Sequence, residues 1–398
     1  MMACRHLKRG AVALLVFFSL LLSCFPAMAS DADDSETTVG VDYGFTVDAR
    51  GAILIEAETG TVLFEQNADA AYSPASVTKI MTLLLVMEAI ESQKIALTDQ
   101  VSVSENAASM GGSQVFLEVG ETMTVEEMIK CTVIASANDA ALALAEFVSG
   151  SESAFVAEMN RRAEELGMIN THFENVTGLD DTTENHVTSA ADIAKMSREL
   201  ISHDLILKYS SVWMDTIRDG AFTLTNTNRL IRYYEGATGL KTGSTEKAKF
   251  CLSATATRSG MTLIAVIMGA PTRDVRNDEA RRLLDYGFAN YALYRADAEH
   301  FSDIPIIGGD QPLGEASHSA FSAVVKKSEL SRVERIVSIP DQIKAPVSIG
   351  DEIGRAVFKI GEVELGSLPI TSTASSAKMN YWQVLLKLLQ RVIFSREF

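Results

Sequence analysis

The order of strand and helix signals predicts an α/β chain, in which an antiparallel sheet flanked by helices carries an inserted helical lobe and precedes a small β-rich domain. Three observations support this fold class. Strand-like segments occur at both ends of residues 40–295, helical periodicity fills the middle of that range, and short alternating segments return over 297–370. With 398 residues, 47% of them hydrophobic, the chain can bury the cores of two or three domains.

The first 29 residues have the pattern of an exported leader. Three basic residues precede an apolar stretch over 11–22, and Ala27-Met28-Ala29 is a small-x-small cleavage site. The stretch is shorter than the roughly 20 apolar residues of a spanning helix, so we expect a cleaved signal peptide and action at the extracytoplasmic face of the cell membrane. Leu21 to Cys24 also resembles a lipoprotein processing box, which leaves lipid attachment at Cys24 as an alternative.

The net charge, the cysteines and the histidines argue against several classes of function. Loss of the leader removes three positive charges and no negative one, so the net charge goes from −17 to −20 and the chain as a whole repels nucleic acid. Two of the four cysteines lie in the leader, and we expect Cys131 and Cys251 to be buried thiols rather than a disulfide or a nucleophile. The six histidines show no metal-ligand spacing, so we expect no metal and no cofactor.

The first domain begins with a hairpin and a helix. After a polar linker over 30–39, residues 52–56 and 61–65 flank Glu58-Thr59-Gly60 and predict two paired strands. Ser76 then opens a helix, which continues through the strong helix formers of 79–91.

The middle of the chain is predicted to be helical, and strands return after it. Amphipathic periodicity marks three helices, at 125–148, 152–166 and 189–200. The polar segment 175–188 is predicted to be a loop. Strand signals follow at 239–242, 251–257 and 261–268, and a helix over 274–294 closes the domain.

The remainder of the chain is predicted to form a β-rich domain and a terminal helix. Short alternating segments predict strands at 322–325, 333–339 and 355–360. Residues 371–378 form a small-residue linker with no predicted structure. The segment 379–398 contains an amphipathic helix over 381–394 that is too short and too charged to span a bilayer, so we expect it to anchor the protein at the membrane surface. Packing on its own protein or on a second copy is the alternative.

One S-x-x-K motif has the setting that nucleophilic catalysis requires. A serine hydroxyl is a weak nucleophile at neutral pH and needs a neighbouring base and a site for the oxyanion. Ser76-Val77-Thr78-Lys79 places an amine one helical turn from a hydroxyl at a helix start. Lys79 becomes a base if burial and a nearby cation lower its pKa. S-x-x-K occurs three times, but only Ser76 opens a predicted helix.

Two further motifs supply complementary groups. Ser136-Ala137-Asn138 lies between apolar helical segments and offers a hydroxyl that can relay a proton and an amide that can bind a peptide bond. Lys241-Thr242-Gly243 begins a predicted strand and offers a cation and a hydroxyl for a carboxylate, with a glycine that permits close backbone approach. Singly, each is explained as a helix cap or a solvated residue. Together, and in this order, the three motifs predict an active site.

The motifs resemble those of the low-molecular-weight penicillin-binding proteins, the serine-type D-alanyl-D-alanine carboxypeptidase family. The resemblance is carried by Tyr72 to Thr82, Ser136 to Ala141 and Gly239 to Thr245, and by the loop from Asn175 to Asp180 with His186 and Thr188. It implies a DD-peptidase/β-lactamase-like fold over 40–295. It further implies that the protein removes the terminal D-alanine from peptidoglycan stem pentapeptides through an acyl-enzyme intermediate, and that penicillins acylate the same serine.

The resemblance also implies a role for each motif residue. The implied catalytic residues are Ser76, Lys79 and Ser136, which act as nucleophile, base and proton relay. The implied substrate-binding residues are Asn138, Lys241, Thr242, Gly243 and Ser244. Asn138 holds the amide of the acyl group, Lys241 and Thr242 bind the terminal carboxylate, and the backbone N–H groups of Ser76 and Ser244 form the oxyanion hole.

Two departures and two rival functions remain open at this point. Ala137 stands where many relatives have glycine and Ser244 where several have histidine, which leaves substrate preference undetermined. A class A-like β-lactamase shares fold and motifs, but such enzymes need a glutamate with an asparagine four residues later, and here Glu174 is followed by Gly178. A non-catalytic penicillin-binding sensor module is the second alternative, against which the intact motifs argue.

Overall fold

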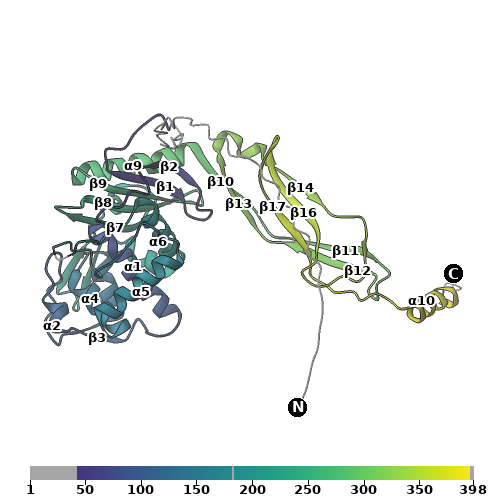
Figure 1. Ribbon diagram of the computed structural model, residues 1–398, viewed down its shortest axis with the longest axis horizontal. Coiled ribbons are helices and arrows are strands. Elements are labelled where there is room, and N and C mark those ends of the chain that lie inside the picture. The colour runs from purple at the N-terminus through teal and green to yellow at the C-terminus, as the bar shows by residue number, and fades with distance from the viewer. Residues whose placement is uncertain (1–42, 182, 395–398) are drawn as a thin grey trace, which may run out of the picture. The chain divides into compact units, whose positions relative to one another are not determined.

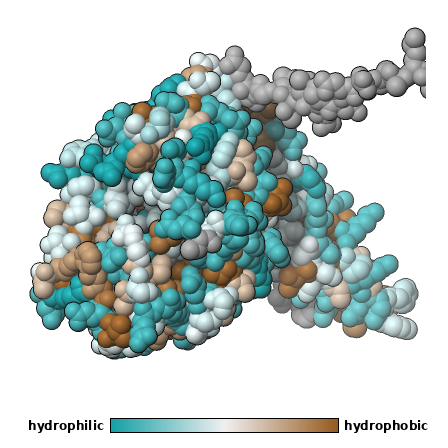
Figure 2. Space-filling model, turned by 60° about the vertical axis from the view of Figure 1, so that its left-hand side comes forward, coloured by the Kyte–Doolittle hydropathy of each residue, from teal (hydrophilic) through white to brown (hydrophobic). Residues whose placement is uncertain are grey.

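The structure, a computed structural model, describes residues 43–181 and 183–394. The leader predicted over 1–29 and the linker predicted over 30–39 lie outside these described residues. The predicted fold class is confirmed: a sheet flanked by helices is followed by a second, β-rich domain (Figure 1). Hydrophilic side chains predominate on the face of the first domain that Figure 2 presents, in keeping with the net charge of −17.

Five antiparallel strands form the sheet of the first domain, in the order β2-β1-β9-β8-β7. Their bounds are Gly51–Glu56 (β1), Val62–Gln66 (β2), Ala237–Thr245 (β7), Lys249–Arg258 (β8) and Met261–Ala270 (β9). β1 pairs with β9, so strands about 200 residues apart in the chain lie side by side. This agrees with the prediction that the strands at the two ends of residues 40–295 belong to one domain. The predicted hairpins β1–β2 and β8–β9 are both present.

Helices cover both faces of this sheet (Figure 1). α9 (Arg273–Asn290) packs on one face, where Gly287 lies so close to Leu54 and Leu263 that a Cβ would be 2.5 Å from a Leu263 methyl. α6 (Ala190–Ser202) packs on the opposite face, against the alternate β1 residues. Both faces of β1 are therefore buried, which explains its uninterrupted apolar run.

The helical lobe is built around α1 (Lys79–Glu91), which is buried on nearly every side and follows the 3-10 turn η1 (Ala75–Thr78). The other helices are α2 (Glu105–Ala108), α3 (Val125–Val133), α4 (Asn138–Ser149), α5 (Glu152–Glu165), α7 (Asp204–Ser210) and α8 (Leu230–Tyr233). Two short ribbons complete the domain: β3 (Gln100–Ser102) with β4 (Thr122–Thr124), and β5 (Met214–Ile217) with β6 (Phe222–Thr225).

Three boundary predictions are wrong. The helix predicted over 125–148 is interrupted between α3 and α4, because Ser136 has a φ of +66° that a helix cannot accommodate. Lys241 lies in the middle of β7 rather than at a strand start. The helix predicted over 274–294 ends at Asn290, and Tyr291–Ala296 forms β10, which pairs with a strand of the second domain.

The second domain contains a six-stranded sheet of order β14-β16-β17-β12-β11-β15, and β10 pairs with β13. Its elements after β10 are β11 (Glu299–Ile307), β12 (Leu313–His318), β13 (Phe321–Lys326), η2 (Lys327–Arg332), β14 (Glu334–Ser338), β15 (Ile343–Lys344), β16 (Glu352–Ile360) and β17 (Val363–Ser372). Phe358 is fully buried in its core and stacks on Phe321 with ring centroids 4.0 Å apart.

The linker predicted over 371–378 is more structured than expected. Thr371 and Ser372 complete β17, Ser376 forms a β-bridge with Val347, and the Ala377 N–H donates to the Asp310 carboxylate. The predicted terminal helix is present as α10 (Tyr381–Phe394). No single helix in the described residues is long and apolar enough to cross a bilayer, and only the pair α4 and α5, bent by 84°, meets that criterion jointly.

Candidate active site

Ser76 lies in η1, at the entrance to α1. It does not begin a regular helix as predicted, because the turn that carries it is 3-10 and Ala75 has a φ of +50°. Gly243 of β7 packs directly against this turn: a Cβ there would lie 2.9 Å from the Ser76 nitrogen and 2.7 Å from the Pro74 carbonyl oxygen. The third motif therefore needs glycine so that the strand can approach the serine.

The Lys79 ammonium position is defined by three hydrogen-bond partners. Its Nζ lies 2.9 Å from Ser76 Oγ, 2.5 Å from Asn138 Oδ1 and 2.8 Å from the Thr177 carbonyl oxygen. The residue is fully buried. Burial, and then the charge of Lys241, hold the pKa of Lys79 well below its usual range, although Asp139 opposes this shift.

These contacts indicate which way the lone pair of a neutral Lys79 points. The carbonyl of Thr177 and the Oδ1 atom of Asn138 only accept hydrogen bonds, so each takes one of the two N–H hydrogens of a neutral amine. The remaining position on the nitrogen faces the Ser76 hydroxyl. A neutral Lys79 can thus accept the hydroxyl proton without moving.

Ser136 and Lys241 form a second hydrogen-bonded pair beside the first. Lys241 Nζ donates to Ser136 Oγ at 2.7 Å and to the carbonyl of Thr242 at 2.9 Å. Both residues are buried, and the left-handed backbone of Ser136 directs its side chain out of the break between α3 and α4. Burial, followed by the charge of Arg276, lowers the pKa of Lys241 to about 7.

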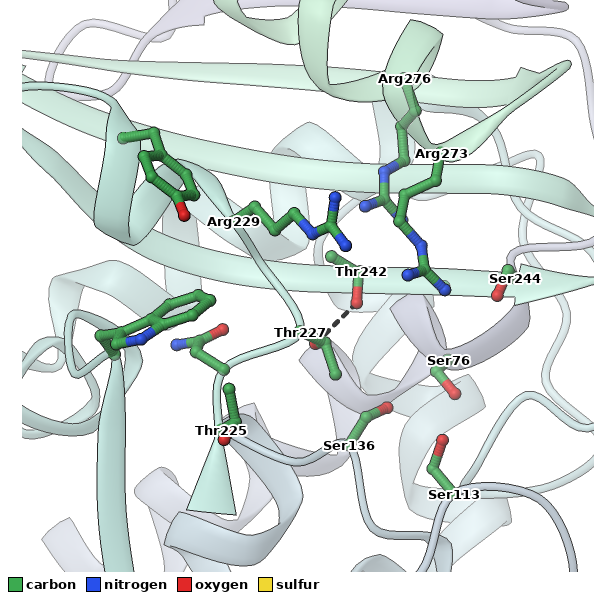
Figure 3. Close-up of a pocket in the computed structure, with 14 residues that line it drawn as sticks. Ser76, Ser113, Ser136, Thr225, Thr227, Arg229, Thr242, Ser244, Arg273 and Arg276 are labelled. Atoms are coloured by element: carbon green, nitrogen blue, oxygen red, sulfur yellow. Dashed lines mark hydrogen bonds between the residues drawn. The ribbon is translucent and has the colours of Figure 1, made fainter. Parts of the chain in front are cut away.

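A cavity of about 620 Å³ opens in front of these residues (Figure 3). Of the predicted site residues, Ser76, Ser136, Thr242, Gly243 and Ser244 line it. Lys79, Asn138 and Lys241 lie buried behind this lining, and Lys79 and Lys241 contact it through the two serines. The structure thus brings all eight predicted residues together, although they come from three distant parts of the chain.

Asn138 has two hydrogen-bond partners within the protein. Its Oδ1 accepts from Lys79, its Nδ2 donates to the Gly111 carbonyl at 2.7 Å, and only 2% of the residue is exposed. Both ends of the amide therefore help to position Lys79 and the segment at Gly111. Because Nδ2 carries two hydrogens, its second N–H can donate to the carbonyl of the acyl amide while the first stays on Gly111.

The loop predicted over 175–188 closes the site from behind. Thr177 supplies the carbonyl that binds Lys79, and Gly178, with φ +82°, approaches η1 so closely that a Cβ would lie 1.8 Å from the Ala75 carbonyl oxygen. His186 ties the loop to η1, because its Nδ1 accepts from the Glu174 N–H and its Nε2 therefore donates to Thr78 Oγ1 at 2.8 Å.

Several residues of the site were missed in the sequence. Thr227 accepts a 2.7 Å hydrogen bond from Thr242 Oγ1, and three arginines line the cavity: Arg229, Arg273 and Arg276. A signal for two of them was present, since Arg273 and Arg276 are spaced by three residues at the start of a predicted helix in an acidic chain. The Thr177 carbonyl that binds Lys79 could not be predicted from the sequence, because every residue type has a backbone carbonyl.

The side chains that commonly bind metal ions do not cluster in the part of the chain that the structure describes. Within residues 43–181 and 183–394, no group of three or more His, Cys, Asp or Glu side chains is arranged to hold a metal ion. Cys131 and Cys251 are both buried and free, as predicted, and burial raises the pKa of the Cys251 thiol to about 11. Neither thiol is available as a nucleophile.

Comparison with known proteins gives consistent matches. The family model for D-alanyl-D-alanine carboxypeptidase matches residues 35–272, and that for the penicillin-binding protein 5 C-terminal domain matches residues 288–378. The chain is 41% identical over 383 residues to D-alanyl-D-alanine carboxypeptidase DacF of Bacillus subtilis, covering 94% of this chain and 96% of that protein.

Solved structures agree with the sequence matches. Penicillin-binding protein 5 of Haemophilus influenzae superposes with a TM-score of 0.74 at 30% identity, covering 84% of this chain and 99% of the other. Penicillin-binding protein D2 of Listeria monocytogenes, solved in an ampicillin-bound form, superposes with a TM-score of 0.57 at 32% identity, covering 61% of this chain and 99% of the other.

Proposed function

This chain belongs to the D-alanyl-D-alanine carboxypeptidase family, and on that premise we propose how its own residues carry out the reaction. It is a serine-type D-Ala-D-Ala carboxypeptidase that acts on peptidoglycan stem peptides and binds penicillin. Ser76 is the nucleophile, Lys79 the base and Ser136 the proton relay. The observation that carries this assignment is the 2.9 Å contact between Lys79 Nζ and Ser76 Oγ, with the other two partners of Nζ being acceptors.

Acylation follows from this geometry. Ser76 Oγ attacks the carbonyl carbon of the penultimate D-alanine while neutral Lys79 takes the hydroxyl proton. The negative charge that develops on the carbonyl oxygen is stabilised by the backbone N–H groups of Ser76 and Ser244. The C–N bond then breaks, and the departing amine receives a proton through Ser136. Water attacks the resulting ester, releases the shortened peptide and returns a proton to Ser76.

The terminal carboxylate of the substrate binds on the β7 side of the site. Protonated Lys241 supplies a charge there, and Thr242 can redirect its hydroxyl from Thr227 to the carboxylate. Gly243 keeps the strand close to Ser76, so that the substrate backbone lies along β7. Binding of the acyl amide by Asn138 stays a prediction, in which one N–H of Nδ2 stays on the Gly111 carbonyl and the other donates to the substrate.

The structure favours the carboxypeptidase over both rivals. In the β-lactamase alternative, position 178 would need an asparagine side chain, but any side chain there meets the Ala75 carbonyl. The Glu174 carboxylate is exposed and accepts from the Asn185 N–H instead of holding a water near Ser76. A sensor module without chemistry has no need for the short contact between the base and the nucleophile.

The predicted leader and α10 support a proposal for where the enzyme acts. We infer export through the leader and action outside the cytoplasmic membrane, where stem peptides occur. α10 adds attachment to the membrane surface: its long apolar side chains are exposed, among them Trp382, Leu386, Leu389 and Val392. A stripe of this kind can be buried in the interface without the helix crossing the bilayer.

A paired substitution tests the nucleophile. Ser76→Ala removes the attacking oxygen, so release of D-alanine from an acyl-D-Ala-D-Ala peptide and covalent labelling by penicillin should both be lost. Ser375→Ala is the matched control, since Ser375 begins another S-x-x-K sequence but is exposed outside the cavity. Mass spectrometry of the labelled peptide in the wild-type protein should place the penicilloyl group on Ser76. A label on any other residue contradicts the assignment.

A further inference from the structure

One aromatic side chain near the active site is exposed on a strained backbone. Phe116 is 69% exposed, and its φ of +57° lies in the left-handed region, which is unfavourable for a bulky residue. Its neighbours Val115 and Leu117 are buried, so the segment turns a single apolar ring to solvent. Residues in such conformations persist where the surrounding contacts hold them, and they cluster at binding and catalytic sites.

Two charged side chains hold this conformation in place. The carboxylate of Asp139, which is 1% exposed, accepts from the N–H groups of Val115 and Leu117, both at 3.1 Å. The Arg218 guanidinium donates to the carbonyls of Val115 and Phe116 at 2.9 and 3.2 Å. These hydrogen bonds stabilise the backbone on both sides of Phe116 while its ring stays in solvent.

The same segment borders the active site. Ser113 lines the cavity together with Ser76 and Ser136 (Figure 3). Asn138 binds the segment twice, since its backbone N–H donates to the Ser113 carbonyl and its side chain donates to the Gly111 carbonyl, each at 2.7 Å. In the proposed function Asn138 holds the acyl amide, so the acyl part of the substrate leaves the site along this segment.

Phe116 lies within reach of the far end of the substrate. The acyl part of a stem pentapeptide has four residues between the scissile carbonyl and the glycan, which extend to roughly 14 Å, and Phe116 is at most roughly 11 Å along the chain from Ser113. The phenylalanine ring offers no hydrogen bond to the polar groups of a peptide. Its face carries negative charge density, which attracts the C–H groups on the flat face of a sugar ring.

We propose that Phe116 is a stacking platform for a sugar ring of the glycan strand that carries the stem peptide. The inference rests on the proposed function, because it concerns the same substrate and the same acyl-enzyme. The contact is remote from the scissile bond and is equal in the ground state and the transition state, so it lowers KM and leaves kcat unchanged. Asp139 and Arg218 hold the segment in place before the substrate binds, which reduces the entropy lost on binding.

Two substrates that differ only in the sugar test this platform. One is an N-lactyl stem pentapeptide, and the other is the same pentapeptide attached through its lactyl group to the amino-sugar disaccharide of peptidoglycan. The wild-type enzyme should hydrolyse the disaccharide form with a kcat/KM about fivefold higher, the effect of one aromatic contact, and the difference should lie in KM. Phe116→Ala should move the ratio of the two kcat/KM values toward one, and Phe116→Tyr, which keeps the ring, should preserve it.

Phe147→Ala is the matched control. Phe147 is another exposed phenylalanine of the same domain, but it lies near the end of α4, outside the cavity. The substitution removes the same side chain and should keep the wild-type ratio.

The outcomes separate the platform from the proposed function. Failure to release D-alanine from either substrate, or to label Ser76 with penicillin, contradicts the proposed function itself. Release of D-alanine with a wild-type ratio at or below one overturns the platform alone. If Phe116→Ala slows both substrates by the same factor and Phe147→Ala slows neither, Phe116 contacts the stem peptide and not the sugar, which also overturns the platform.

Discussion

In the proposed mechanism, two buried lysines in contact with two serines have opposite tasks, and their surroundings differ accordingly. Lys79 has to be neutral to accept a proton, and burial together with the charge of Lys241 favours its neutral form. Lys241 has to be charged to bind a carboxylate, yet burial and Arg276 lower its pKa to about 7. At neutral pH the free enzyme therefore divides between states with Lys241 charged and uncharged.

The pH profile should report this balance. As pH rises through about 7, Lys241 loses its charge and kcat/KM should fall, while on the acid side it should fall as Lys79 becomes protonated. A bound carboxylate stabilises charged Lys241, so the alkaline limb of kcat should lie at higher pH than that of kcat/KM. Arg276→Gln removes a neighbouring cation and should shift the alkaline limb of kcat/KM upward. Arg282→Gln, exposed on the same helix, should leave it in place, and an unmoved limb in Arg276→Gln refutes this account.

At the scale of elements, the site depends on the fit between η1 and the loop over 175–188. This loop delivers the Thr177 carbonyl to Lys79, and Asp180 binds Thr245 of β7 through a 2.5 Å hydrogen bond. His186 completes the attachment, and burial lowers its pKa to about 4, so the imidazole is neutral and its tautomer is defined by its two partners. The loop thereby connects the turn that carries Ser76 and Lys79 with β7, which carries Lys241.

Gly178→Ala should separate packing from backbone strain in this loop. Gly178 and Gly150 have nearly the same φ, +82° and +81°, but a Cβ at Gly150 meets nothing within 4 Å and one at Gly178 meets the Ala75 carbonyl. Gly150→Ala should cost about 1 kcal/mol of unfolding free energy from its backbone alone. Gly178→Ala should cost more and should also slow acylation by penicillin, because Thr177 shifts away from Lys79. Equal melting temperatures for the two variants would rule out the close approach.

The sequence predicts elements better than it predicts their interruptions. Apolar periodicity located the long helices and the five sheet strands of the first domain, because both faces of the sheet and nearly all of α1 are buried, but it did not predict the short elements α2, α7, α8 and β3 to β6. It missed the break at Ser136, since a left-handed serine between two helices is imposed by tertiary contacts rather than by local preference. It also extended α9 over Tyr291–Ala296, whose strand conformation depends on pairing with β13.

For the whole molecule, the motifs predicted the candidate active site but not all of the groups that it contains. Ser76, Ser136 and Lys241 converge as expected because S-x-x-K, S-x-N and K-T-G residues each act through their side chains. The Thr177 carbonyl and the close approach at Gly178 escaped prediction, since both are backbone properties of a long loop. The three arginines escaped because their meeting depends on how α9 and the segment before α8 are packed around β7.

The proposed attachment to a membrane has to be compatible with an acidic protein. A net charge of −17 opposes approach to anionic lipid, so binding has to come from apolar burial along α10. Trp382, Leu386 and Leu389 are spaced for one face of the helix and are 70%, 60% and 48% exposed, while Lys387 lies on the other side and Gln390 at the edge of the apolar face. The bridge between Ser376 and Val347 holds the chain leading to α10 on the second domain.

Adjacent substitutions in α10 should distinguish apolar burial from charge. Leu389→Glu and Gln390→Glu each add one negative charge, but only the first removes a side chain from the apolar face. Leu389→Glu should therefore weaken co-sedimentation with phosphatidylcholine vesicles containing phosphatidylglycerol by at least about tenfold, the value of burying one leucine. Gln390→Glu should bind nearly as the wild type does, with D-alanine release unchanged in both. If Leu389→Glu instead dissolves a dimer in sedimentation experiments and leaves vesicle binding intact, α10 mediates self-association and the anchor is refuted, because the same apolar face cannot be covered by both partners at once.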